Sequence, residues 1–441
     1  MKMAVLGSGY LGTVYATVMA SLGHQVVAID VDEQKIDSLN AAEPAFHEPG
    51  LKPLLIQELA SGRLRFTTDA ATALKSVGII FICVGTPQSI DGNSTDLKFL
   101  YESVDAITCF ANAGALVVGK STVPVGTAAQ LAVRLSEYQL DLAWSPEFLR
   151  EGEAIRNAMM PDRIIVGVNS SDVEMVLREV YKPFSNAGVK VIFTDFHTTE
   201  LSKLAANAFL ATKISFVNAM AEICDSAGGD VLVLAGAIGC DERIGQRFLQ
   251  PGIGFGGGCL AKDLRSLISS ASRYGVDNLA KFLEQVDEIN LRQRHNAVQL
   301  VEEMCRGPLL GKKICILGIA FKPNTDDIRD SAAIGIALTL KELGATVRIY
   351  DPRAMKITKH HYPMFGFGSS VMDAAYGADI VLHLTDWPEF LEIEPSQLGT
   401  VVQHKRILDG RNALNSELWM NDGWSYRALG RRTALSRSGI I

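Results

Sequence analysis

Residues 251–264 (PGIGFGGGCLAKDL) combine the residue types in this chain that are best suited to covalent chemistry. Five glycines lie between positions 252 and 258, and Cys259, Lys262 and Asp263 follow them. Glycine allows positive φ angles and close approach of the backbone to a ligand, which a simple connector does not need. A nearby lysine lowers a thiol pKa and makes the thiolate available. The segment predicts a nucleophilic cysteine, and the alternative is a flexible turn followed by a small buried cysteine.

The composition is that of a globular protein with two or three domains, because 441 residues exceed what one core holds. A formal net charge of −7 without a lysine or arginine block argues against nucleic acid as the partner. Seven cysteines without a CxxC pair and eight histidines without ligand spacing predict a reducing compartment and no metal site. We expect a cytoplasmic protein without a membrane partner, since we find no signal peptide or spanning apolar run.

The first thirty residues predict a strand, a glycine turn, a helix and a second strand. Gly7, Gly9 and Gly12 form a GxGxxG motif directly after the first strand, and Asp30 ends the second. In this context the motif is typical of a dinucleotide site in which the acid hydrogen-bonds a ribose hydroxyl. The acid favours NAD over NADP, because a carboxylate repels a 2′-phosphate. A turn that serves only packing is the alternative.

Further polar residues follow buried strands in FICVGTP, KSTVPVGT and LDLAWSPEF. Ligands of doubly wound sheets lie beyond the carboxyl ends of the strands, so Thr86, Ser121 and Thr122 are expected to face the same crevice as Gly9. Turn formation or helix capping explains these hydroxyls equally well. Glu147 lies at the next strand end, and its residue type and position alone favour a glutamate in the first turn of a helix over a functional group.

From about residue 198 the pattern becomes helical. Lys203 and Asn207 lie four residues apart and share a stripe of an alanine-rich helix, where a solvated surface lysine is the alternative. A second long amphipathic helix ends near Gly307 and is expected to form a spine between domains and a dimer surface.

Residues 312–352 repeat the opening pattern strand for strand but retain only Gly318 of its glycines. The fold class expected is α/β, with two doubly wound Rossmann-like domains joined by a long central helix. The boundaries expected are 1–196, 197–305 and 306–441. Charged residues at the second set of strand ends suit a phosphate-bearing ligand, although Asp327 and Arg329 could simply form an ion pair. These strand-end residues are Lys322, Asp326, Asp327, Arg329, Asp409, Arg411 and Asn412.

Seven motifs in order resemble those of the nucleotide-sugar 6-dehydrogenases over nearly the whole chain. They are GSGYLG, FICVGTP, KSTVPVGT, SPEFLREGEAI with PDRIIVG, ELSKLAANAFLATKISFVN, RIGQRFLQPGIGFGGGCLAKDL and GIAFKPNTDDIRDS. The family has serine and proline where this chain has Gly258 and Ala261, which leaves the rigidity of the loop and turnover open.

The resemblance implies oxidation of a primary alcohol to a carboxylate by two hydride transfers to NAD. Cys259 would be the nucleophile that forms a thiohemiacetal and then a thioester, because an aldehyde yields a hydride only after a nucleophile has added to it. Lys203 and Asn207 would stabilise the oxyanion, Asp263 and Glu147 would position and deprotonate water, and Thr122 would lie near that water.

The resemblance also implies binding residues. The expected cofactor contacts are Gly7, Gly9, Gly12, Asp30, Lys35, Thr86, Glu151, Lys262 and Arg329, which assigns Lys262 to NAD rather than to the thiol. The expected substrate contacts are Lys203, Asn207, Arg243, Phe255, Gly256, Lys322 and Arg411, with Arg243 reaching across a dimer interface. The substrate expected is UDP-glucose, in a homodimer or higher homo-oligomer. GDP-mannose, a UDP-N-acetylhexosamine, or a homologue that binds without catalysis are the alternatives.

Overall fold

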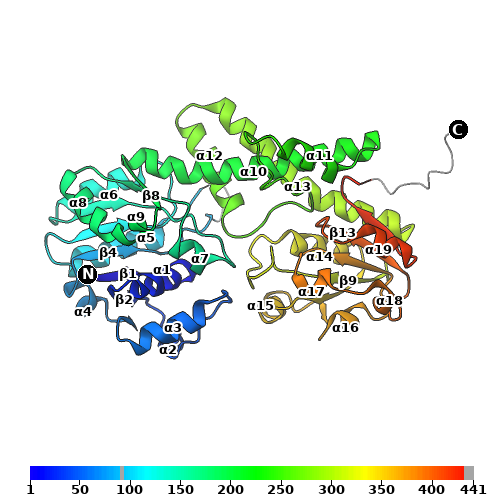
Figure 1. Cartoon of the computed structure of the whole chain (residues 1–441), viewed down its shortest axis with the longest axis horizontal. Coiled ribbons are helices and arrows are strands. Elements are labelled where there is room, and N and C mark those ends of the chain that lie inside the picture. Colours follow the sequence, from blue (N-terminus) through cyan, green and yellow to red (C-terminus); the bar gives the residue numbers. More distant parts are fainter. Residues whose placement is uncertain (90–93, 432–441) are drawn as a thin grey trace. The chain divides into compact units, whose positions relative to one another are not determined.

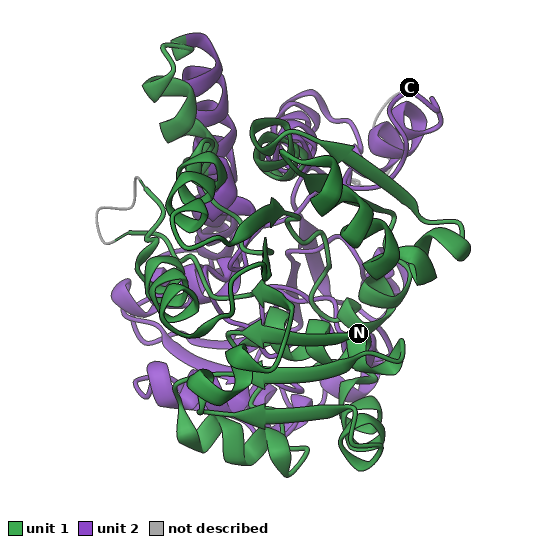
Figure 2. Ribbon diagram, turned by 90° about the vertical axis from the view of Figure 1, so that its left-hand side faces the viewer, with its two compact units in different colours: residues 1–207, 265–277 green, residues 208–264, 278–441 purple. Residues whose placement is uncertain are grey.

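The structure is a computed structural model that describes residues 1–89 and 94–431. The chain divides into two units, the first formed by residues 1–207 and 265–277 and the second by residues 208–264 and 278–441 (Figure 2). Each unit contains one sheet, and Figure 1 labels the strands and helices in chain order. The division into three domains expected from the sequence stays a prediction.

The sheet of the first unit has the strand order β3-β2-β1-β4-β5-β6-β7-β8 in the described residues. Its strands are β1 (Lys2–Leu6), β2 (Gln25–Ile29), β3 (Leu64–Thr67), β4 (Ile79–Ile82), β5 (Leu116–Gly119), β6 (Asp141–Trp144), β7 (Arg163–Gly167) and β8 (Lys190–Thr194). The first six strands follow the doubly wound order, all parallel. β7 pairs with β6 in the antiparallel direction through Trp144 and Gly167.

The two faces of this sheet are buried under different helices, because successive side chains of a strand point to opposite sides. Met3 and Val5 of β1 pack in a cluster with side chains of α1, α2, α3 and α8, whereas Ala4 and Leu6 pack with those of α4, α5 and α6. The helices of this unit's sheet domain are α1 (Tyr10–Ser21), α2 (Glu33–Asn40), α3 (Leu51–Ala60), α4 (Ala70–Lys75), α5 (Lys98–Phe110), α6 (Thr127–Ser136), α7 (Ala154–Met159), α8 (Ser171–Val180) and α9 (Lys182–Asn186).

The sheet of the second unit has the order β11-β10-β9-β12-β13-β14, and every neighbouring pair is parallel. Its strands are β9 (Lys313–Leu317), β10 (Thr346–Tyr350), β11 (Gly366–Phe367), β12 (Ile380–His383), β13 (Arg406–Asp409) and β14 (Ser425–Ala428). Its helices are α14 (Ala332–Glu342), α15 (Met355–His361), α16 (Val371–Ala375), α17 (Pro388–Leu391), α18 (Pro395–Leu398) and α19 (Ser416–Asn421). The second doubly wound domain expected from the repeated pattern is therefore confirmed.

Four helices lie between the two sheets in the chain: α10 (Phe196–Ala227), α11 (Val231–Gly239), α12 (Leu260–Arg273) and α13 (Asp277–Cys305). Helix α10 begins in the first unit and ends in the second, and α12 runs from the second unit into the first. The long central helix is thus confirmed. By length and composition alone, α10 is the one helix in the described part of the chain that could cross a membrane, a test that buried core helices also pass.

Candidate active site

The glycine turn between β1 and α1 has the shape that a dinucleotide needs. Gly7 has φ +91°, and a Cβ on Gly12 would lie 1.7 Å from the carbonyl oxygen of Gly7, so neither position accepts a side chain. Gly9 caps α1 without a side chain, which leaves the first amides of the helix open to an anion. The residues present therefore fit the pyrophosphate of a dinucleotide.

Asp30 lies directly after β2 and anchors this turn. Its carboxylate accepts hydrogen bonds from the backbone amide of Ser8 at 2.8 Å and from Nζ of Lys35 at 3.0 Å, and its side chain is 10% exposed. Asp351, the corresponding acid after β10, is 1% exposed and accepts from the amides of Ile319 and Ala320. The carboxylate of Asp351 is thus hydrogen-bonded within its own turn, which agrees with the loss of a dinucleotide site in the second unit.

The loops after β4 and β5 are tied together by their hydroxyl groups. Thr86 donates to the carbonyl oxygen of Thr122 at 2.7 Å, and Ser121 donates to that of Val84 at 2.7 Å. Both hydroxyls thus shape the loops. A hydroxyl that donates one hydrogen bond still offers lone pairs to a ligand, so the cofactor role of Thr86 stays a prediction.

A largely buried ion pair lies at the ends of β5 and β6. Lys120 and Glu147 are 3.0 Å apart, with side chains 5% and 15% exposed, and Glu147 also accepts from the amide of Phe148. Burial alone would raise the pKa of Glu147, but the charges of Lys120 and Lys203 and the hydrogen bonds lower it overall. Glu147 is therefore a carboxylate at neutral pH, as a general base must be.

Lys203 and Asn207 lie one turn apart on α10 and are buried, at 7% and 8% exposure. The ammonium of Lys203 lies 5.2 Å from the ring centroid of Phe148, the residue after Glu147. The interpretation of Lys203 as a solvated surface lysine is therefore wrong. The first unit brings Glu147, Phe148 and Lys203 together. The carboxylate of Glu147 therefore lies near two cations, Lys120 and Lys203.

The sequence places Lys120 at the end of a strand, in KSTVPVGT, but gives no signal of its pairing with Glu147. Another unforeseen group is Glu48, whose carboxylate accepts from the amides of Gly152 and Ala154 at 2.7 Å and from the hydroxyl of Tyr10. Glu48 thereby fixes the loop that carries Glu151. In the sequence, Glu48 is marked only by the proline and the glycine that follow it, and this pattern does not identify a distant partner.

In the second unit, the glycine loop is held by two buried asparagines that the sequence did not reveal. Asn290 of α13, 1% exposed, accepts from the amide of Phe255 at 2.7 Å and donates to the carbonyl of the same residue at 3.2 Å. Asn218 of α10 accepts from the amide of Gly252 at 2.9 Å. A buried side-chain amide that pairs with both backbone groups of one residue fixes that residue, so the loop is a rigid element.

Cys259 ends this loop immediately before α12 and is exposed, whereas Phe255 is 6% exposed. The interpretation of Cys259 as a small core cysteine is therefore wrong. Its carbonyl oxygen accepts from the amide of Asp263 at 2.9 Å, and the carboxylate of Asp263 lies 2.7 Å from Nζ of Lys262. Lys262 thus has a carboxylate partner of its own, as expected for a lysine that does not serve the thiol alone.

Two arginines of the second sheet's strand ends contact the glycine loop. The carbonyl of Arg329 accepts from the amide of Gly257, and its guanidinium pairs with Asp327 at 2.7 Å. Arg411 donates to the carbonyl oxygens of Leu384, Gly254 and Phe321. The alternative of an ion pair between Asp327 and Arg329 is thus present in the structure.

Two other predicted substrate contacts of the second unit are Lys322, which is half-buried, and Arg243, which is exposed. Lys322 has its ammonium 5.6 Å from the ring centroid of Phe321. Arg243 is paired with Asp241, and its side chain is 88% exposed, so its guanidinium can reach a neighbouring molecule. The candidate residues are therefore divided, with Glu147, Lys203, Asn207 and Thr122 in the first unit and Cys259, Asp263, Lys322 and Arg411 in the second.

The fold and these residues define a nucleotide-dependent dehydrogenase: one doubly wound domain has an open glycine turn with its acid, and an exposed cysteine follows a braced loop. Family models for the UDP-glucose/GDP-mannose dehydrogenases match the chain in its NAD binding domain (residues 1–185), central domain (197–292) and UDP binding domain (315–416). The chain belongs to this family and is an NAD-dependent dehydrogenase.

Relatives match over nearly their whole length. The UDP-glucose 6-dehydrogenase of Rickettsia conorii is 38% identical over 98% of this chain and 100% of its own, and UDP-glucose 6-dehydrogenase TuaD of Bacillus subtilis is 40% identical over 98% and 93%. Among solved structures, a UDP-glucose dehydrogenase from Pyrobaculum islandicum aligns with a TM-score of 0.89 at 33% identity, covering 98% of both chains. A UDP-D-ManNAc dehydrogenase from Pyrococcus horikoshii aligns with a TM-score of 0.86 at 28% identity, covering 98% and 99%.

Proposed function

We propose that this protein oxidises UDP-glucose to UDP-glucuronate, with the transfer of two hydrides to NAD through intermediates bound to Cys259. The observation that carries the proposal is the exposed cysteine at the end of a loop that Asn218 and Asn290 hold in place. Relatives named UDP-glucose 6-dehydrogenase, matched over 98% of this chain, support the substrate.

The first unit would hold the cofactor. Bound NAD would supply the hydride acceptor, with one molecule of NAD for each of the two oxidations. The open amides at the start of α1 bind its pyrophosphate, and Asp30, fixed by Ser8 and Lys35, accepts a hydrogen bond from the ribose. Because Asp30 is a carboxylate, a 2′-phosphate at this position is disfavoured, so NADP binds more weakly.

The chemistry assigned to Cys259 follows from the valence of an aldehyde. The first oxidation removes a hydride from the alcohol carbon and a proton from its hydroxyl. The sulfur of Cys259 then forms a bond to the aldehyde carbon, and the resulting thiohemiacetal loses a second hydride and a proton to become a thioester. Water adds to the thioester, the carbon–sulfur bond breaks, and the acid and the free thiol are released.

The remaining residues would stabilise the negative charge that develops in these steps and would accept the protons that are released. Lys203 and Asn207 offer buried donors to the oxyanion that develops when sulfur or water adds to the carbonyl carbon. Glu147 and Asp263 are the carboxylates that orient the water and take its proton, and Thr122 lies near that water in this assignment. Lys120 keeps Glu147 ionised, so that its carboxylate can accept a hydrogen bond from the water and orient it.

The experiment is to follow NADH absorbance with a panel of nucleotide sugars and to compare Cys259→Ser with Cys240→Ser. Cys240 is a matched control because it is also an exposed cysteine of the second unit. We expect about two NADH per UDP-glucose, full turnover in Cys240→Ser, and bound ligand without release of acid in Cys259→Ser. Undiminished turnover in Cys259→Ser would remove the thiol from the mechanism.

The same panel tests the other nucleotide sugars. The similarity to the UDP-D-ManNAc dehydrogenase favours a UDP-N-acetylhexosamine as the second candidate substrate. NADH production from that sugar, with none from UDP-glucose, would keep the mechanism and change the substrate. Binding of NAD and nucleotide sugar without any absorbance change would instead support a homologue without catalysis.

We further propose that the chain forms a homodimer through α10. Phe209, Phe216 and Ile223 recur at seven-residue intervals on this helix, at 67%, 50% and 57% exposure, and form an apolar stripe. Phe216→Glu should shift the mass measured by light scattering to that of a monomer. An unchanged mass for this variant would place the interface elsewhere.

A further inference from the structure

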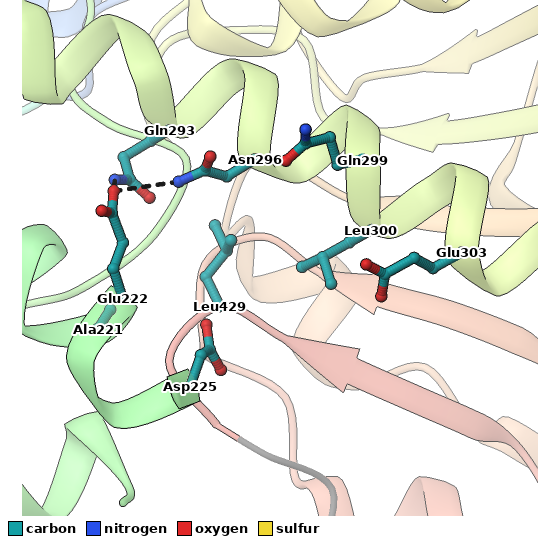
Figure 3. Close-up of a pocket in the computed structure, with 9 residues that line it drawn as sticks. All are labelled: Ala221, Glu222, Asp225, Gln293, Asn296, Gln299, Leu300, Glu303 and Leu429. Atoms are coloured by element: carbon teal, nitrogen blue, oxygen red, sulfur yellow. Dashed lines mark hydrogen bonds between the residues drawn. The ribbon is translucent and has the colours of Figure 1, made fainter. Parts of the chain in front are cut away.

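A cavity of about 200 Å³ in the second unit lies apart from the glycine loop. Its walls come from the end of α10, from the second half of α13 and from Leu429, which follows β14 (Figure 3). Three carboxylates line it, from Glu222, Asp225 and Glu303. Acidic residues alone do not define a site, so the state of each polar atom must be considered.

Gln293 is the buried polar side chain of this cavity. It is 0% exposed, and its Nε2 donates to Oε1 of Glu222 at 2.9 Å, which leaves its carbonyl oxygen buried without a hydrogen-bond partner. Figure 3 shows this oxygen turned toward the space in front of Leu429. A buried acceptor without a partner is destabilising, and a ligand with an N–H donor would supply the missing hydrogen bond.

Asn296 has the same orientation, because its Nδ2 also donates to Oε1 of Glu222, at 3.1 Å. One N–H of each amide is thus directed to the same carboxylate, which leaves both amide oxygens for other partners. Together with the carboxylates, these oxygens are hydrogen-bond acceptors that a ligand with donors would complement.

The charges around the cavity also favour a ligand that donates hydrogen bonds. Glu222 is neutralised by Arg292 through two contacts of 3.1 Å, whereas Asp225 accepts from the backbone amide of Gly430. Burial raises the pKa of Asp225, the hydrogen bond from Gly430 and the charge of Arg427 oppose this in part, and the negative charges of Glu222 and Glu303 add to it. Glu303 has Arg427 at 3.7 Å, which is at the limit of an ion pair. The cavity has an excess of negative charge at neutral pH.

The apolar part of the wall and the small volume limit the ligand further. Leu300 and Leu429 lie between the polar groups of Gln293 and the carboxylate of Glu303 in Figure 3. Cavities for drug-sized ligands hold roughly 300–1,000 Å³, so nucleotides are too large. Among residues 1–89 and 94–431, no group of three or more His, Cys, Asp and Glu side chains could hold a metal ion.

We propose that this cavity binds a short aliphatic diammonium ion. One ammonium group donates to the carbonyl oxygen of Gln293 and to Asp225, the methylene chain packs on Leu300 and Leu429, and the other ammonium group pairs with Glu303. The proposal assigns a ligand to a site that plays no part in the oxidation reaction, so its failure would leave the proposed function intact.

The test is isothermal titration calorimetry of the full chain with 1,4-diaminobutane, repeated for Asp225→Asn and Glu303→Gln. Glu302→Gln is the matched control, because it removes the same charge from the neighbouring residue of α13, which does not line the cavity. Hydrogen bonds to charged groups contribute about 1.5–3 kcal/mol, so each cavity variant should weaken binding about tenfold or more. The control should bind as the wild type does, and butylamine should bind more weakly than the diamine.

A second measurement guards against a misfolded variant. The thermal midpoint of the wild type should rise with diamine concentration, and that of Asp225→Asn should not, although both start from similar midpoints. No binding to the wild type at millimolar diamine would overturn the proposal. Equal affinity in wild type and both cavity variants would overturn it as well, because binding would then be on another surface.

Discussion

Two glycines of the glycine loop, Gly256 and Gly258, should respond differently to the same change to alanine. A Cβ on Gly256 would lie 2.2 Å from the carbonyl oxygen of Asp330, whereas a Cβ on Gly258 would lie 2.7 Å from Cζ of Arg329. Neither glycine has a positive φ, so backbone strain does not distinguish them. The difference lies in whether the obstructing atom can move.

The obstacle at Gly256 is fixed backbone. The carbonyl of Arg329, one residue earlier, accepts from Gly257, and Arg294 holds the side chain of Asp330 at 2.9 Å. Overpacking against atoms that cannot retreat costs about 1–3 kcal/mol. At Gly258 the obstacle is the tip of a side chain that is 63% exposed, and its displacement weakens an exposed ion pair with Asp327, which is worth about 0–1 kcal/mol.

The assay is urea denaturation of Gly256→Ala and Gly258→Ala, with NADH production as a second readout. We expect Gly256→Ala to lose about 1–3 kcal/mol of unfolding free energy and most of its turnover, and Gly258→Ala to remain within about 1 kcal/mol of the wild type. Gly258→Ser, which restores the residue of the family's usual signature, should behave as Gly258→Ala does. Equal losses at the two positions would refute the argument from space around each glycine.

Two further predictions concern charged residues of the first unit. Asp30→Asn should lower affinity for NAD more than for NADP, because the variant no longer repels a 2′-phosphate; an unchanged affinity ratio would argue against the ribose contact. Glu147→Gln should cost about 3–5 kcal/mol at pH 7, because it leaves Lys120 charged and largely buried, and Lys120→Met in the same chain should recover part of that loss. The pKa of Glu147 is lowered in the folded protein from its ordinary value of 4.5, so its contribution is present above pH 4.5 and lost as the pH falls below this value. Unfolding of wild type and Glu147→Gln should therefore converge in acid, and a constant difference down to pH 3 would contradict the ion pair.

Both doubly wound domains could be predicted from the sequence, since each opens with a buried strand, a glycine and an apolar helix. A continuous apolar run of strand length is a local property, and β1 and β9, which are buried after their first residue, both have it. The antiparallel step between β6 and β7 was not predicted. It depends on Trp144 meeting Gly167, a position where a Cβ would lie 2.8 Å from the hydroxyl of Thr199. That constraint joins three distant segments and has no local signal.

The sequence allows candidate site residues to be placed at the ends of strands, but it does not show which of these residues pair with one another. Thr86, Thr122 and Glu147 were placed at the ends of strands because a parallel sheet brings those ends to one edge. The pairing of Glu147 with Lys120 is set by the register of β5 and β6, and nothing in either segment alone specifies it. Asn218 and Asn290 show the same limit, because each is one polar residue within a long helix.

Arg411 shows why a charge at a strand end does not define a role by itself. Its position suits a phosphate-bearing ligand and the family resemblance implies a substrate contact, yet its guanidinium donates to the carbonyls of Leu384, Gly254 and Phe321. Three of its five N–H groups are thus used to connect the glycine loop to the second sheet, and two remain for a ligand. A lysine would keep the charge but could not make this planar set of contacts. The side chain therefore shapes the loop that carries Cys259, whether or not it also contacts the nucleotide.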